Sequence, residues 1–166
     1  AAFVTQELER KGVTVITGQS ATAFEEAGKK IILEDGTILK SDLTILSVGV
    51  QPETKLAKAA GLALGLRDGL KVNEHYQTSN PDIYAVGDVI LVKNQITGTD
   101  ALISLASPAN RQGRQVADVI AGLKRTNKGS IGTAIVRVFD LSAAATGLSE
   151  RAAKQAGLDF AVIHTS

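Results

Sequence analysis

The stretch that decides the fold covers residues 78 to 88 and reads Thr78-Ser79-Asn80-Pro81-Asp82-Ile83-Tyr84-Ala85-Val86-Gly87-Asp88. A polar turn precedes a short apolar run, residues 83–86, which predicts a buried strand. Gly87 and Asp88 stand where that strand would end, and open α/β sheets bind ligands at the carboxyl ends of their strands. Gly87 would let a ligand approach the backbone, and the Asp88 carboxylate would accept hydrogen bonds from sugar-like hydroxyls. An ordinary strand-to-turn junction fits the same residues, so both interpretations stay open here.

The chain around this stretch alternates strand and helix patterns, which predicts an α/β architecture. We expect helices over residues 1–11, 54–60, 108–123 and 149–156. We expect strands over residues 13–16, 30–33, 37–39, 43–48, 70–72, 83–86, 133–139, 141–146 and 160–164. Asp35-Gly36 between two apolar runs predicts a hairpin, and the continuous apolar run at 43–48 is typical of a strand covered on both faces. Ser149 is expected to cap the helix after it, and residues 127–132 to form a linker.

A second stretch, residues 101–114, predicts the start of the longest helix. Ser107 would be its N-cap and Pro108 its first helical residue. Its unpaired N–H groups and positive dipole end would suit an anion or a developing negative charge. A plain capped core helix explains the same residues. The expected buried stripe, in which Gly113 would allow close packing, consists of Ala109, Gly113, Val116, Ile120 and Leu123.

Composition excludes several function classes. The 166 residues carry a formal net charge of +1 and are 44% hydrophobic, which predicts a packed core and no nucleic-acid partner. No apolar run approaches the roughly 18 residues of a membrane span, so no membrane partner is expected. The cysteine count is 0, which removes disulfides and a cysteine nucleophile, and His75 and His164 are expected at the surface rather than on a metal. Because methionine is also absent, we expect a piece of a longer protein.

Three motifs resemble one family. Residues 78–88 resemble the second FAD-binding motif of the flavoprotein pyridine nucleotide-disulfide oxidoreductases, T-x-x-x-x-I-[FY]-A-x-G-D. Residues 45–53 resemble the shorter motif at the junction of the family's NAD and FAD domains. Residues 105–114 are similar to the helix opening beside the flavin ring in the branch that holds coenzyme A disulfide reductase, NADH oxidase and NADH peroxidase. Three further segments, 132–134, 138–140 and 146–150, resemble the start of that branch's dimerisation domain.

The resemblance implies a partial FAD/NAD(P)-binding Rossmann-like fold followed by the beginning of an α+β dimerisation domain. Residues 1–42 would be the tail of the NAD(P)-binding domain. Residues 43–126 would be the C-terminal half of the FAD-binding domain, and residues 127–166 the start of the dimerisation domain.

The resemblance also implies a set of cofactor-binding residues and no catalytic or metal-ligating residue in this chain. Asp88 would bond the ribitol–phosphate region of FAD, with Gly87 giving access to it. The peptide units at Leu105 and Ala106, with the helix opening at Ser107, would face the pyrimidine edge of the flavin. Gly49 completes the set and would lie where the nicotinamide nucleotide approaches.

By resemblance, the chain is a fragment of an enzyme that passes electrons from NAD(P)H through FAD to an acceptor. That acceptor would be a disulfide such as coenzyme A disulfide, a peroxide or oxygen. The family's redox cysteine would lie upstream, so the isolated chain is expected to be inactive. A small-molecule substrate, a homo-oligomer and a cytoplasmic location are implied as well. The alternatives are a non-catalytic nucleotide-binding or self-associating domain and a purely structural piece.

Overall fold

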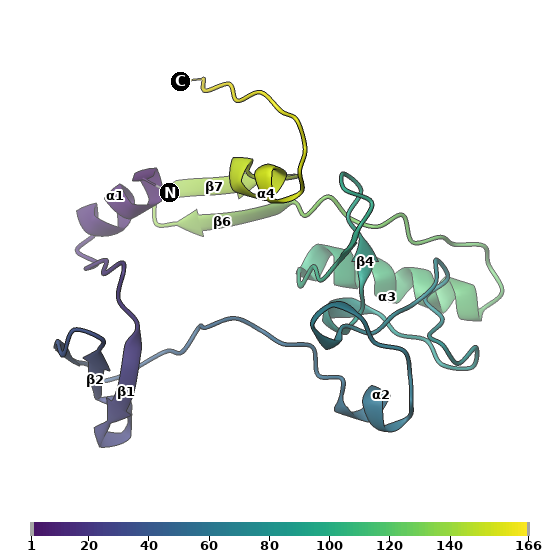
Figure 1. The fold of residues 1–166 in the computed structure, drawn as a ribbon, viewed down its shortest axis with the longest axis horizontal. Helices are drawn as coiled ribbons and strands as arrows, with labels where there is room; N and C mark the ends of the chain where they lie inside the picture. Colours follow the sequence, from purple (N-terminus) through teal and green to yellow (C-terminus); the bar gives the residue numbers. More distant parts are fainter. Residues whose placement is uncertain (1, 166) are drawn as a thin grey trace. The chain divides into compact units, whose positions relative to one another are not determined.

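A computed structural model describes residues 2–165 and shows a mixed α/β chain (Figure 1), as the sequence predicts. The helices within this range are α1 (Ala2–Arg10), α2 (Lys55–Ala59), α3 (Ala106–Ile120) and α4 (Glu150–Gln155), with 3-10 turns η1 (Glu26–Gly28), η2 (Leu66–Asp68) and η3 (Gly87–Val89). The strands are β1 (Ala21–Glu25), β2 (Lys30–Leu33), β3 (Ile38–Lys40), β4 (Val92–Lys93), β5 (Asp100–Ala101), β6 (Ala134–Val138) and β7 (Leu141–Ala145).

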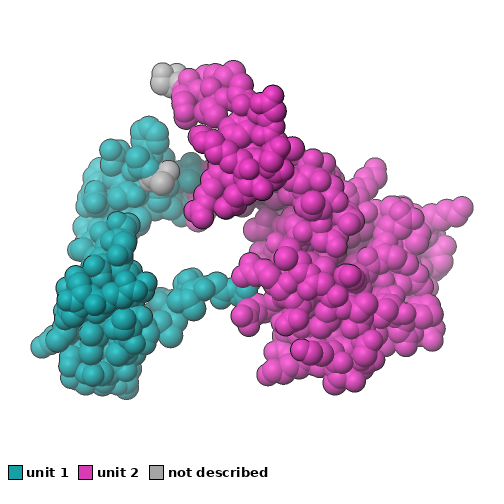
Figure 2. All heavy atoms as spheres, viewed as in Figure 1, with its two compact units in different colours: residues 1–50, 137–143 teal, residues 51–136, 144–166 magenta. Residues whose placement is uncertain are grey.

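The chain divides into two compact units (Figure 2). The first consists of the residues up to Val50 together with Arg137–Ala143. The second consists of Gln51–Val136 together with the residues from Ala144 onward. Each unit has its own internal contacts.

In the first unit, β1, β2 and β3 form an antiparallel sheet in that order. The hairpin between β2 and β3 confirms the Asp35-Gly36 prediction: Ile32 pairs with Ile38, and Gly36 has a φ of +83°. The Asp35 side chain accepts a hydrogen bond from the Thr37 N–H at 2.9 Å, which closes the turn. Strand β1 was not expected, because its sequence lacks a run of apolar residues.

The strand expected over residues 43–48 is wrong, since this segment has no strand pairing in the structure. Its apolar side chains face solvent, with Leu43 75%, Ile45 81% and Val48 93% exposed. A central strand of a parallel sheet forms only between two neighbouring strands, and the described residues supply none beside this segment. The strands expected over 13–16 and 160–164 are likewise irregular.

The core of the second unit gathers around Tyr76, Ile90 and Val92, which are 0%, 1% and 4% exposed. Val116 from α3 packs on this cluster. The strands expected over 70–72 and 83–86 reduce to isolated bridges, at Leu70 and at Tyr84. The chain there pairs in short local turns rather than in a long parallel sheet.

Helix α3 buries only part of the apolar stripe that its periodicity predicts: Val116 packs on the core and Ala109 is half-buried, but the stripe does not continue to the end of the helix. Ile120 and Leu123, both expected in the buried stripe, are 64% and 54% exposed. A side chain added at Gly113 would meet nothing within 4 Å, so this glycine does not serve close packing in the described chain. The buried residue of α3 is Gln112, which is 6% exposed and whose side chain accepts a hydrogen bond from the Gly87 N–H.

The predicted helix cap at Ser149 is confirmed: Ser149 caps α4, and its side-chain oxygen accepts the Ala152 N–H at 3.2 Å. Residues 127–132, predicted as a linker, form no helix and only an isolated bridge at Ser130, and hydrogen bonds hold them within the second unit. The Asn127 N–H donates to the Glu74 carbonyl at 2.7 Å, and the Ser130 N–H donates to the Lys93 carbonyl at 2.9 Å.

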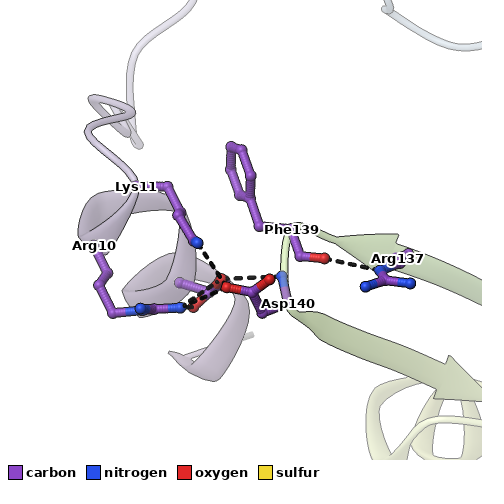
Figure 3. Close-up of polar contacts among 6 residues, drawn as sticks. Arg10, Lys11, Arg137, Phe139 and Asp140 are labelled. Carbon is purple, nitrogen blue, oxygen red and sulfur yellow. Dashed lines mark hydrogen bonds and ion pairs between the residues drawn. The ribbon is translucent and has the colours of Figure 1, made fainter.

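An ionic cluster in the first unit joins α1 to the turn between β6 and β7 (Figure 3). The Asp140 carboxylate lies 2.6 Å from Lys11 Nζ and 3.3 Å from Arg10 Nη2. Arg10 also bonds Glu7, whose carboxylate accepts the Asp140 N–H at 3.3 Å. The Arg10 hydrogen bond lowers the pKa of Glu7, and Lys11 followed by Arg10 lowers the pKa of Asp140.

We expect acid to release α1 from this turn. The pKa values of Glu7 and Asp140 are lower in the folded chain than in the unfolded one. The ionic cluster therefore stabilises the contact fully at pH values above the ordinary carboxyl pKa, and this stabilisation is lost as the pH falls through the lowered pKa values. Amide hydrogen exchange of α1, corrected for intrinsic rates, should therefore quicken between about pH 5 and about pH 2. Asp140→Asn should quicken it already at neutral pH, whereas Asp42→Asn, an exposed carboxylate of the same unit, should not. Exchange rates of α1 that change neither with pH nor with Asp140→Asn would contradict this expectation.

Candidate functional site

The two motifs singled out in the sequence meet in the second unit. The 3-10 turn η3, which carries Gly87 and Asp88, packs against α3. The Gly87 N–H donates a hydrogen bond of 2.7 Å to Oε1 of Gln112, in the middle of α3. The residues before the turn form a short hairpin of their own, in which Gln77 and Tyr84 are bridge partners. A hairpin and a turn, rather than the end of a long strand, therefore present Asp88.

The turn leaves Gly87 and Asp88 open to a ligand. Gly87 has a φ of +84°, and a Cβ built on it would meet nothing within 4 Å. The Asp88 side chain is exposed, and residues 2–165 provide it with no hydrogen-bond or ion-pair partner. Its carboxylate oxygens are acceptors that can bind hydroxyl groups of a ligand.

Helix α3 begins two residues earlier in the motif than expected. Leu105 occupies the N-cap position, with extended φ and ψ of −132° and 138°, and its side chain makes no capping hydrogen bond. The prediction of Ser107 as N-cap is therefore wrong, since Ser107 is the second helical residue. Pro108 has no N–H, so Ala106 and Ser107 carry the donors of the first turn, and neither finds an acceptor in the described part of the chain. The helix opening thus offers two backbone donors.

A cavity of about 340 Å³ lies beside this helix opening. Ser107 and Arg111 line it from α3, and residues 126–131 line it from the segment after the helix. Tyr76, at the base, donates its hydroxyl hydrogen bond to Gln115. Burial raises the pKa of Tyr76, against the opposing positive charge of Arg111, so the hydroxyl stays protonated near neutral pH.

Sequence reasoning missed Tyr76, Gln112 and Gln115. One signal was available: two glutamines three residues apart lie on one face of a helix. Apolar periodicity cannot reveal them, because it assigns a glutamine to the solvent face unless its partner is known.

Of the six predicted site residues, Gly49 belongs to the first unit. Gly49 follows the exposed apolar segment 43–48, and its φ of +104° is one that glycine adopts without strain. The other five predicted residues, Gly87, Asp88 and Leu105–Ser107, all belong to the second unit.

Residues 2–165 provide neither a group of metal ligands nor a membrane-spanning helix. They contain no cluster of three or more His, Asp or Glu side chains placed to hold a metal ion. No helix in the same range is long and apolar enough to cross a membrane. His75 Nδ1 forms a hydrogen bond with the Arg125 carbonyl at 2.8 Å, which fixes its ring on the segment after α3.

The sequence profile described as pyridine nucleotide-disulphide oxidoreductase matches residues 1–113 of this chain. The chain belongs to this family. A CoA-dependent NAD(P)H sulfur oxidoreductase of Pyrococcus furiosus is 38% identical over 128 residues, which are 77% of this chain and 29% of the relative. An NADH oxidase of Methanocaldococcus jannaschii is 34% identical over 150 residues, 90% of this chain and 33% of the relative.

Solved structures of the family have the same fold over almost the whole chain. Reduced CoADR-RHD of Bacillus anthracis matches with a TM-score of 0.91 and 46% identity, covering 96% of this chain and 29% of that one. An NAD-dependent persulfide reductase of A. fulgidus matches with a TM-score of 0.92 and 34% identity, covering 96% and 30%. The chain therefore spans about a third of the length of its family relatives.

Two glycines of the second unit, Gly87 and Gly129, give a matched test of backbone strain against crowding. Gly129 and Gly87 have similar φ values, +78° and +84°, but a Cβ on Gly129 would lie 2.1 Å from the Lys93 carbonyl oxygen. Gly87→Ala should lower the free energy of unfolding by about 1 kcal/mol through backbone strain alone. Gly129→Ala should lower it by about 3 kcal/mol or more, because overcrowding adds to the strain. Urea unfolding of both variants measures the difference, and equal losses would contradict it.

Proposed function

We propose that this chain forms the flavin-facing part of an NAD(P)H-dependent flavoprotein oxidoreductase. The observation that carries the proposal is the hydrogen bond between Gly87 and Gln112, which brings the Asp88 turn onto α3. The turn supplies an unpartnered carboxylate, and the opening of α3 supplies two unpartnered N–H donors. Membership in the family and the fold match to reductases of the family support the same assignment.

The residues fit FAD by their chemistry. Asp88 would accept hydrogen bonds from ribityl hydroxyls, and Gly87 would let the ribityl chain lie close to the backbone. The N–H groups of Ala106 and Ser107, which follow Leu105 at the opening of α3, would donate to the pyrimidine edge of the flavin, whereas the Leu105 N–H is already bonded to the Ile103 carbonyl. The positive end of the helix dipole there would stabilise negative charge on that edge. Bound FAD would supply the hydride and electron chemistry, for which the chain itself provides no redox-active cysteine.

The domain assignment is part of the same proposal. Residues 1–42 would be the tail of the NAD(P)-binding domain, 43–126 the C-terminal half of the FAD-binding domain, and 127–166 the start of the dimerisation domain. Gly49 would then lie beside the approaching nicotinamide nucleotide. This division is a proposal about the parent protein and follows the family resemblance of the motifs.

The electron acceptor of the parent would be a small molecule. The relatives' names include a CoA-dependent sulfur oxidoreductase and an NADH oxidase, so a disulfide or persulfide of coenzyme A and oxygen are the leading choices, with peroxide as a third. Reaction at a sulfur substrate would need a cysteine from another part of the parent, because this chain has none. A cytoplasmic location belongs to the same proposal and rests on the family alone.

Titration of the purified chain with FAD, followed by flavin fluorescence, tests the proposal. We expect saturable binding that Asp88→Ala weakens by about tenfold or more, because hydrogen bonds to a charged group are lost. Asp82→Ala is the matched control, since it removes an exposed carboxylate from the same hairpin. Binding that both substitutions leave unchanged would remove Asp88 from the site, and no binding at all would refute a flavin site in the isolated chain.

A self-associating domain is the second candidate function, favoured by the apolar segment 43–50. Three of its side chains, Leu43, Ile45 and Val48, are each at least 75% exposed. Burial of apolar surface of this kind stabilises association, and an unpaired extended segment can pair with another chain.

We therefore expect multi-angle light scattering to show a dimer or larger species at micromolar concentration. Ile45→Lys should shift the population toward the monomer, because a charged side chain would have to be buried in the contact. Leu56→Lys, at an equally exposed apolar residue of α2, should not. A strictly monomeric wild-type chain would rule out this candidate.

A further inference from the structure

The buried residue of α3 is polar. Gln112 is 6% exposed, at a place where a core helix would ordinarily bury an apolar side chain. Burial of a carboxamide is unfavourable unless its polar atoms are hydrogen-bonded. Oε1 of Gln112 meets this requirement by accepting the Gly87 N–H at 2.7 Å. Its side chain thereby holds the backbone of the residue next to Asp88.

A second glutamine acts in the same way at the other end of the hairpin. Gln115, three residues further along α3, accepts the hydroxyl hydrogen of Tyr76, which is 0% exposed. The Tyr76 carbonyl in turn accepts the Ala85 N–H at 3.0 Å, which pairs the two sides of the hairpin. Tyr76 and Gly87 therefore lie at the two ends of the hairpin. Both are hydrogen-bonded to glutamine side chains on one face of α3. We call Gln112 and Gln115 the glutamine clamp.

We propose that Gln112 is a positioning residue for the flavin site, with Gln115 supporting it. The clamp fixes the Asp88 turn on the same helix whose first turn offers the donors of Ala106 and Ser107. A ligand that contacts both groups then meets one preorganised surface and does not have to order the turn when it binds. This inference rests on the proposed function, because its role is to keep the two halves of a flavin site in register.

The chemistry of the clamp suggests a discriminating pair of substitutions. Gln112→Met keeps the length and volume of the side chain and removes the acceptor, which leaves the Gly87 N–H without a partner. Gln112→Glu keeps an oxygen at the same place and should rescue the hydrogen bond. Gln155→Met, at an exposed glutamine of α4 in the same unit, is the matched control for the substitution itself.

The first experiment needs no flavin. Amide hydrogen exchange, read by NMR, should quicken about tenfold at Gly87 and its neighbours in η3 when Gln112 is replaced by methionine. Exchange in the last turns of α3 should stay as in the wild type. Gln112→Glu, which keeps the acceptor but buries a charge, should quicken exchange at η3 less than Gln112→Met does, and Gln155→Met should leave it unchanged. A uniform increase across α3 and the core would overturn the inference, because it would show that Gln112 only contributes to overall stability.

The second experiment measures FAD affinity in a double-mutant cycle with Asp88→Ala. Gln112→Met should weaken FAD binding about tenfold in the wild-type chain and by less than about twofold when Asp88 is already alanine. Equal weakening in both backgrounds would mean that Gln112 does not act through Asp88, and would overturn the inference. A wild-type chain that binds no FAD would refute the proposed function of the isolated chain, and the exchange experiment would still decide whether Gln112 holds the turn.

Discussion

The candidate site of the second unit depends on the hydrogen bond from the Gly87 N–H to the side chain of Gln112, which joins segments 25 residues apart in the sequence. Gly87 has a positive φ, and the neighbouring Val86 and Val89 pack on the core only half-buried. Without an acceptor from α3, the turn would have an unsatisfied N–H where it meets the helix. With it, a short loop becomes part of the same packed body as Tyr76, Ile90 and Val116.

The first unit shows what happens when such a constraint is absent. Leu33 is the large apolar residue that reaches the buried class among its described residues, while Ile45 and Val48 face solvent. Its hairpin forms because local turn geometry and antiparallel pairing need only adjacent residues. The apolar run at 43–48 can form a strand only if strands from distant segments pair with it. Apolar residues therefore form a strand in the hairpin of β2 and β3, whereas at 43–48 they form an exposed, irregular segment.

This difference also decides how much the sequence could predict. Signals that act within a few residues were read correctly: the Asp35-Gly36 hairpin, the Ser149 cap and the helix pattern of α1. The strands expected over 43–48 and 83–86 failed, because strand formation depends on partners that periodicity does not contain. For the candidate site, the motifs predicted the segments that meet in the structure. Gln112 and Gln115, which join these segments, could not be predicted, because burial of a glutamine depends on a hydrogen-bond donor far away in the sequence.

The combination of groups at the candidate site also limits the ligands that it can take. The first turn of α3 alone would suit any anion, because it offers two N–H donors at the positive end of a helix. A free carboxylate at Asp88, held on the same helix, would repel a simple phosphate that approached it. A ligand that fits both must present carbonyl or anionic acceptors at one end and hydroxyl donors at the other. An isoalloxazine ring joined to a ribityl chain has this arrangement, whereas a free inorganic anion does not.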